Sequence, residues 1–179
     1  MEGYKEIKFE ELTENLYEMT AKNWFALTAG NENGYNSMTV SWVQFGSLWS
    51  DGKEKNGFRG MPVATVYSRD SRYTKKFLDA NDYFSLSTFG NEKRRELGYL
   101  GSHSGRDGDK FAACGLEPLF TDGTVAVSGA KIIFVCRKLY TSRVEEKGFS
   151  DKNVLENSYP KRDFHQLYVG KIEKIYVKK

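Results

Sequence analysis

The sequence predicts a mainly β fold, an antiparallel barrel or sandwich with a few short helical insertions. Aromatic residues make up 15% of the 179 residues, which favours β-rich structure over a plain helical bundle. Short β-favouring runs recur along the chain, and the helical stretches between them are too few and too scattered for alternating βαβ units. The length and a hydrophobic content of 39% suit one folded domain.

The strands are predicted in chain order from runs of branched and aromatic residues. Residues 1–22 are charged and mildly amphipathic, and they predict an N-terminal extension or short helix before a main domain at residues 23–179. A turn-rich stretch at residues 30–36 contains an Asn-Gly pair and predicts a hairpin. In the last run, Gly170 interrupts the alternation and marks a bulge or sharp bend. The predicted strands cover residues 24–29, 38–44, 62–68, 83–88, 125–128, 131–137 and 166–177.

Three short helices are expected between these strands. Ser71 is a natural N-cap for the first helix, while Gly101 and Gly115 are stop signals for the second and third. The helices are predicted at residues 71–80, 91–100 and 107–114.

The charge balance argues against a protein that tracks a nucleic-acid backbone. The 27 basic and 24 acidic residues give a net charge of only +3. Residues 1–90 carry 10 basic and 12 acidic groups, whereas residues 91–179 carry 17 and 12, so positive charge is concentrated in the second half. This distribution favours a small anionic ligand. The polar N-terminus has no signal-peptide pattern and no stretch approaches a membrane span, so we expect a cytoplasmic protein without membrane contact.

Several common chemistries have no local support in the sequence. Cys114 and Cys136 are the only cysteines, and we expect both to be reduced and structural. With only two histidines and no Cys-x-x-Cys spacing, no metal site is predicted. The chain also lacks a Walker loop, a Gly-x-Gly-x-x-Gly motif after a strand, a Gly-x-Ser-x-Gly elbow and a His-Glu-x-x-His helix.

The stretch from Arg69 to Lys76 is a candidate anion site. It joins a predicted strand to a predicted helix and holds two arginines beside the hydroxyls of Ser71 and Thr74. Guanidinium groups and free amides at a helix start suit phosphate oxygens. The alternative interpretation is a well-capped helix with a solvated basic face.

A glycine-rich loop at residues 103–110 is a second candidate. It has a cation at each end and leads into a predicted helix, so it is able to wrap a phosphate or to hold a neighbouring loop. The alternative is a surface turn in which Arg106 and Asp107 form a local ion pair.

The polar strand at residues 36–42 is a third candidate. Period-two geometry places Thr39 and Ser41 on one face and the apolar side chains on the other. A planar heterocycle is able to lie along such an edge and take backbone hydrogen bonds. The alternative is an ordinary barrel strand.

In combination, four segments give a more specific signal than any one of them. Residues 36–42, 46–49, 62–74 and 104–110 resemble the flavin reductase-like family, the FMN-binding split barrels close to flavoredoxin. The resemblance extends over roughly residues 20–177. It implies a Greek-key split β-barrel, usually a homodimer, with FMN bound non-covalently near the subunit interface.

The resemblance also implies a set of cofactor-binding residues. Two positions depart from the family pattern, since Asp70 stands where relatives often have Pro and Lys171 stands where they often have an acidic residue. Carried over by position, the set comprises Asn36, Met38, Thr39, Val40, Ser41 and Trp42 along the isoalloxazine, Arg69, Ser71, Arg72, Tyr73 and Thr74 around the phosphate and ribityl chain, Ser104, Gly105 and Lys110 in the loop that completes the site, and His165 before the last strand.

The implied function is that of a flavin reductase. Such a protein moves a hydride from NADH or NADPH to bound FMN and passes electrons to a free flavin, a small acceptor or a redox partner protein, with no side chain required as acid or base. Two alternatives stay open at this stage. One is an FMN electron-transfer module without NAD(P)H turnover, and the other is a flavin-free β-barrel that binds nucleic acid as OB-folds do.

Overall fold

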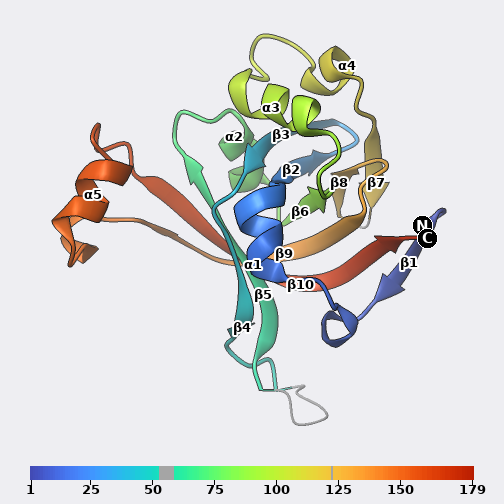
Figure 1. Ribbon diagram of the computed structural model, residues 1–179, viewed down its shortest axis with the longest axis horizontal. Helices are drawn as coiled ribbons and strands as arrows, with labels where there is room; N and C mark the ends of the chain where they lie inside the picture. The colour runs from blue at the N-terminus through green and yellow to red at the C-terminus, as the bar shows by residue number, and fades with distance from the viewer. Residues whose placement is uncertain (53–58, 122) are drawn as a thin grey trace.

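The computed structural model describes residues 1–52, 59–121 and 123–179, and in them the chain folds as a mainly antiparallel β-protein (Figure 1). Seven strands form one sheet in the order β3-β2-β6-β9-β10-β5-β4, with β1 added beside β10, and β7 pairs with β8 in a separate hairpin. The strands are β1 (Tyr4–Ile7), β2 (Phe25–Asn31), β3 (Gly34–Val40), β4 (Val43–Leu48), β5 (Met61–Arg69), β6 (Tyr83–Thr88), β7 (Pro118–Thr121), β8 (Thr124–Val127), β9 (Ile132–Arg143) and β10 (His165–Lys178).

The sheet order requires a closed, curled architecture. β3 and β4 lie at opposite ends of the order, yet only Ser41 and Trp42 separate them along the chain. The sheet must therefore curl until its two edge strands approach each other, which is the split-barrel arrangement expected from the sequence. The expectation of an antiparallel split barrel with short helices is confirmed.

Alternating side chains divide the interior into two apolar clusters. In β2, Phe25 and Leu27 point into the barrel, while Ala26 packs on the outer side with residues of α3, α4 and β8. β9 divides in the same way, since Phe134 faces the barrel and Ile133 the outer cluster. Both faces of the central strands are thus buried, and the helical layer is fixed against the barrel wall.

Short helices cap the barrel and its long β9–β10 ribbon. In Figure 1, α2, α3 and α4 gather at one end of the barrel, while α5 stands on a ribbon that projects away from it, and the two chain ends lie side by side near β1. The helices are α1 (Leu16–Glu18), α2 (Thr74–Ala80), α3 (Arg94–Ser102), α4 (Lys110–Cys114) and α5 (Lys152–Ser158), with a π-helix at Met19–Asn23 and 3-10 turns at Phe9–Glu11 and Glu146–Gly148.

Two local predictions are confirmed in detail. The hairpin between β2 and β3 turns at two residues, because Asn31 pairs with Gly34. The β9–β10 register shifts between Val169 and Gly170, as the interrupted alternation indicated. Gly170 is required there by space, because a Cβ atom would lie 2.7 Å from the ring of Phe84.

Other local predictions were wrong. The single strand predicted at 38–44 is two strands, because β3 ends at Val40 and β4 begins at Val43. The helix predicted from Ser71 begins at Thr74, so Ser71 is not its N-cap, and Gly101 lies inside α3 rather than stopping it. Gly115 does end α4, with a φ of +68°. β1, β7 and α5 were not predicted, and β1 brings part of residues 1–22 into the main sheet.

Candidate functional site

Two adjoining pockets open where β3 and β5 end beside the start of β10. The larger is a groove of about 280 Å³, and the smaller is a pocket of about 100 Å³ between the β5–α2 turn and the loop that follows α3. Met38 and Arg72 line both, so the two pockets adjoin across these side chains. The groove is lined by Met38, Thr39, Val40, Ser41, Trp42, Tyr67, Ser68, Arg69, Arg72 and His165, and the small pocket by Met38, Ser71, Arg72, Tyr73, Thr74, Leu100, Ser102, His103, Ser104, Gly105 and Lys110.

Aromatic rings form the outer wall of the groove. The chain leaves β3 at Val40, so Trp42 lies in the connection to β4 with 46% of its surface exposed. Its ring centroid is 4.7 Å from that of His165, and the planes are tilted by 37°. The hydroxyl of Tyr159 lies 2.8 Å from His165 Nδ1, which fixes the imidazole from behind. The groove therefore offers a flat aromatic surface beside a polar strand end.

His165 is neutral at physiological pH. Burial, followed by the positive charges of Arg69 and Arg72, lowers the pKa of His165 to about 4, and the carboxylate of Asp163 offsets this only in part. The imidazole can therefore offer a hydrogen bond without adding charge to the groove.

Arg69 is fully engaged with the protein. Its guanidinium forms an ion pair with Asp163 and donates to the backbone oxygens of Asp163 and Ser158. It also lies 5.4 Å from the ring centre of Tyr159. This arginine ties the start of β10 and the end of α5 to β5, and its charge is matched by a carboxylate.

Arg72 and Lys110 have a different environment in the small pocket. The Arg72 guanidinium donates to the backbone oxygen of Gly101 at 2.9 Å, and the Lys110 ammonium donates to that of Leu100 at 2.9 Å. Within the described residues, neither forms an ion pair with a carboxylate. Burial, and then the nearby Arg72 charge, lowers the pKa of Lys110 to about 8. Two unmatched cations in one small pocket create a local preference for an anion.

Asn36 and Gly105 hold the small pocket in shape. The amide of buried Asn36 donates to Thr74 Oγ1 at 2.7 Å, which links β3 to the first residue of α2. A Cβ atom on Gly105 would lie 2.2 Å from Asn36 Oδ1 and 2.9 Å from the Tyr73 ring, so only glycine permits this approach. Arg106 completes the support, because its guanidinium donates to the backbone oxygen of Ser71 at 3.3 Å.

The structure brings the sequence-predicted residues together, but several of them have a different position or contact from the one expected. All of them line the groove or the small pocket except Asn36, which supports the pocket from beneath. The predicted clamp of Arg69 and Arg72 is divided, because only Arg72 reaches the small pocket. Thr39 Oγ1 donates to the backbone oxygen of Leu97, so this hydroxyl anchors α3.

Sequence reasoning missed part of the lining. Tyr67 and Ser68 lie within the segment 62–74, and His103 is the first residue of the predicted loop, but none of the three was assigned to the site; Ser102 directly precedes that loop. Inclusion of every residue of these segments would have found Tyr67, Ser68 and His103, and extension of the loop by one residue would have found Ser102. Tyr159 had no such signal, because its contact with His165 depends on the unpredicted helix α5.

The two departures from the family pattern have structural partners. Asp70 forms an ion pair with Arg143 at 2.8 Å and lies 3.8 Å from the ammonium of Lys75, which ties the β5–α2 turn to β9. Lys171 forms an ion pair with Asp51 at 2.6 Å. Neither residue lines the groove or the small pocket.

Comparisons with known proteins agree with this architecture. The family model for the flavin reductase like domain matches residues 60–179. An FMN-binding domain of a flavin reductases-like enzyme from Shewanella baltica superposes with a TM-score of 0.66 at 14% identity, over 98% of this chain and 77% of that one. Flavoredoxin of Desulfovibrio vulgaris gives a TM-score of 0.63 at 18% identity, over 97% and 78% of the two chains.

A third solved structure is of the same kind. An FMN-binding protein from Thermus thermophilus with bound p-hydroxybenzaldehyde gives a TM-score of 0.63 at 19% identity, over 98% of this chain and 82% of that one. At these identities the structures demonstrate a shared fold. A search of curated protein sequences gives no match.

With the family model covering two thirds of its length, the chain belongs to the flavin reductase-like domain family. This membership gives no support to a flavin-free nucleic-acid-binding barrel. In the described part of the chain, no helix is long and apolar enough to cross a membrane.

Proposed function

We propose that this protein is an FMN-binding oxidoreductase of the flavin reductase type. The observation that carries the proposal is the small pocket beside the aromatic-walled groove, where Arg72 and Lys110 have no carboxylate partner among the residues that the structure describes. When bound, FMN would supply the redox chemistry, accepting a hydride from NADH or NADPH and passing electrons to a flavin, a small acceptor or a protein.

The residues of the small pocket fit the phosphate end of FMN. Arg72 and Lys110 provide two cationic donors, and the hydroxyls of Ser71 and Ser104 lie in the same lining. Charge-assisted hydrogen bonds of this kind contribute on the order of 1.5–3 kcal/mol each. Gly105 allows the loop to close on Asn36 and Tyr73, so the donors are placed before a ligand arrives.

The residues of the groove fit a flat heterocycle. The end of β3 and the Ser41–Trp42 connection offer backbone groups along one edge, and Trp42 and His165 form an aromatic wall. Because His165 is neutral, the groove adds no proton donor of low pKa, and we assign no residue the role of acid or base. The chain's contribution is to bind and orient the flavin ring and to shield it from water.

The nicotinamide requires no dinucleotide-binding fold in this proposal. The chain has no Gly-x-Gly-x-x-Gly motif after a strand, so few contacts should hold the nicotinamide and its binding should be weak. Stacked flat rings place donor and acceptor atoms at roughly 3–3.5 Å without acid–base assistance.

Anaerobic stopped-flow spectroscopy tests the proposal. Purified protein should hold FMN, and its long-wavelength flavin band should bleach when NADH or NADPH is mixed with it. A flavin that dithionite reduces readily, but that millimolar NADH and NADPH leave oxidised, would contradict the reductase assignment. That result would favour an electron-transfer module that exchanges electrons only with protein partners.

A homodimer is the second part of the proposal. Large apolar side chains remain on the surface of the single chain, among them Trp49 and Tyr140, whose ring centroids are 5.7 Å apart with 47% and 49% exposure. A two-fold interface would bury such side chains. Light scattering should give the mass of two chains at micromolar concentration. A monomer with FMN still bound would contradict the proposed homodimer.

A further inference from the structure

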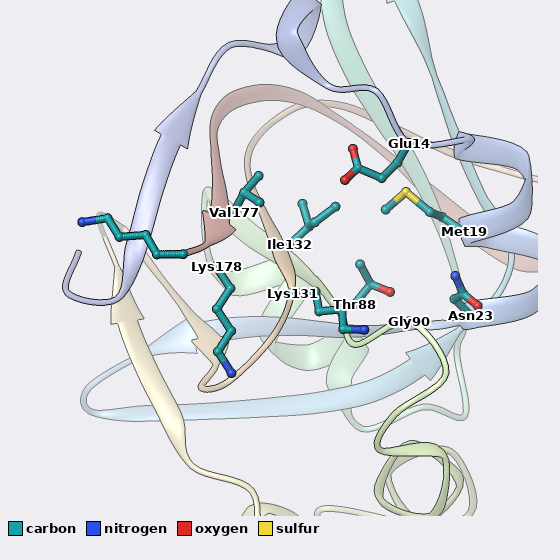
Figure 2. Close-up of a pocket in the computed structure, with 10 residues that line it drawn as sticks. Glu14, Met19, Asn23, Thr88, Gly90, Lys131, Ile132, Val177 and Lys178 are labelled. Atoms are coloured by element: carbon teal, nitrogen blue, oxygen red, sulfur yellow. The ribbon is translucent and has the colours of Figure 1, made fainter.

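A separate pocket of about 410 Å³ lies between the N-terminal segment and the end of the β9–β10 ribbon where β9 begins and β10 ends (Figure 2). Its walls come from the region around α1 and the π-helix, from the end of β6, and from the adjoining ends of β9 and β10. It shares no lining residue with the groove or the small pocket. Its volume lies in the range of small-molecule sites.

Thr88 places an unused polar group at this pocket. The residue is 2% exposed, and within the described residues its Oγ1 atom has no hydrogen-bond partner. Its backbone oxygen is satisfied, because it accepts from the backbone N–H of Lys131 at 2.8 Å. A buried hydroxyl without a partner is destabilising, and a ligand in the pocket is one way to satisfy it.

The remaining lining is apolar on one side and predominantly basic on the other. Met19, Ile132 and Val177 supply the apolar surface, and three of the four charged lining residues are lysines, the exception being Glu14. Figure 2 shows the Lys131 ammonium and the Thr88 hydroxyl on the same side of the pocket, near Gly90. Lys131 also forms an ion pair with Glu92 at 3.1 Å, so the three lysines face two carboxylates, Glu14 and Glu92, and the wall keeps one excess positive charge.

The N-terminal wall is held in an uncommon conformation. Met19 and Asn23, which both line the pocket, are the first and last residues of a π-helix, and the next residue, Trp24, has a φ of +55°. Arg94 stabilises this geometry, since its guanidinium lies 4.5 Å from the Trp24 ring centre and donates to the backbone oxygen of Lys22. π-Helical turns are rare and are found frequently at functional sites.

We propose that this pocket binds a small organic carboxylate with an apolar body. The carboxylate accepts hydrogen bonds from the Thr88 hydroxyl and the Lys131 ammonium, and the apolar body lies against Met19, Ile132 and Val177. An uncharged analogue would satisfy the hydroxyl but leave the excess positive charge of the lysines uncompensated. The proposal is independent of flavin binding, because the pockets share no residue.

Benzoate is a suitable probe, with benzyl alcohol as its uncharged analogue. With methyl-labelled methionine, the NMR signal of Met19 reports on this pocket and that of Met38 on the flavin site. Benzoate should shift the Met19 signal saturably and leave the Met38 signal unchanged, and benzyl alcohol should bind at least about tenfold more weakly. Thr88→Val should weaken benzoate binding by about tenfold or more, while Thr88→Ser should retain it.

Thr124→Val is the matched control. Thr124 is also buried, and its hydroxyl has no partner within the described residues, but it lies on β8 outside the pocket, so its replacement should leave benzoate affinity unchanged. The proposal is overturned if the Met19 signal does not respond to benzoate up to about 10 mM. A response at Met38 alone, equal binding of benzyl alcohol, or undiminished affinity in a folded Thr88→Val variant would also overturn it. If Thr88→Val does not fold, Lys131→Gln replaces it, with the same expected loss and the same contrary outcome.

Discussion

Arg69 and Arg72 lie three residues apart, yet the structure gives them different charge environments. Arg69 is paired with Asp163 and donates to backbone oxygens, so its positive charge is compensated within the protein. The Arg72 guanidinium donates to the Gly101 oxygen, pairs with no carboxylate among the described residues, and shares a small pocket with Lys110. The comparison shows that two cations of one basic motif differ in their attraction for an anion, because a carboxylate partner weakens that attraction at Arg69.

Of the variants considered, Arg72→Ala should have the largest effect on FMN affinity. Loss of one charge-assisted donor should weaken FMN binding by roughly tenfold to a hundredfold, whereas riboflavin, which has no phosphate, should change much less. Lys110→Met should act in the same direction. Fluorescence titration with both flavins measures the two effects.

Arg69→Ala is the control for that prediction. Because Arg69 lines the groove and is paired with Asp163, its loss should weaken FMN and riboflavin to a similar extent. The assignment of the phosphate to Arg72 rather than Arg69 is wrong if Arg69→Ala weakens FMN more than riboflavin while Arg72→Ala weakens both equally.

Gly105→Ala should weaken FMN binding by about tenfold, because its Cβ atom would displace Asn36 or Tyr73 from the small pocket. Gly98→Ala is the matched control, since a Cβ atom at that position in α3 meets no atom within 4 Å. That variant should bind FMN normally and unfold at a slightly higher temperature, because alanine is the better helix former. Equal FMN affinity in the two variants would show that the close approach at Gly105 does not shape the site.

The pH dependence of FMN binding should report on Lys110. Its pKa of about 8 in the free protein means that the ammonium loses its proton above that pH, and a bound phosphate dianion would raise the pKa again. FMN affinity should therefore fall as pH rises above about 8, by up to about tenfold per pH unit, with proton uptake on binding. Calorimetry in buffers of different ionisation enthalpy measures the uptake. Lys110→Met should remove it, and uptake that persists in this variant would assign the proton to another group.

Salt should have the smallest effect. Added salt screens the attraction between the pocket and the phosphate, so FMN affinity should decrease several-fold from roughly 0.01 to 0.15 M ionic strength, and riboflavin affinity should hardly change. A parallel salt response of both flavins would place the electrostatic contribution outside the small pocket.

The sequence allowed much of the fold to be predicted. Long branched runs identified β5, β6, β9 and β10, and Gly170 marked the register shift. The break between β3 and β4 was not predictable, because Ser41 and Trp42 continue the alternating pattern and only barrel closure turns the chain there. The short edge strand β1 has no apolar run of its own and depends on pairing with β10.

The residues of the candidate site could be collected from the sequence, but their roles could not. Ser71 fits the N-cap pattern, yet the chain makes a turn before α2 and the helix begins at Thr74. The neutralisation of Arg69 depends on Asp163, which lies 94 positions away in the sequence. Charge compensation of this kind is a tertiary property, and the spacing of a motif contains no information about it.

The most direct test of the account is a comparison of FMN and riboflavin binding to the flavin-free protein at pH 7. The two flavins differ only in the phosphate, so their affinity ratio measures what the pocket of Arg72 and Lys110 contributes. The account predicts that FMN binds at least about a hundredfold more tightly, as two charge-assisted contacts require. Equal affinities would contradict the central claim that this pocket anchors the cofactor.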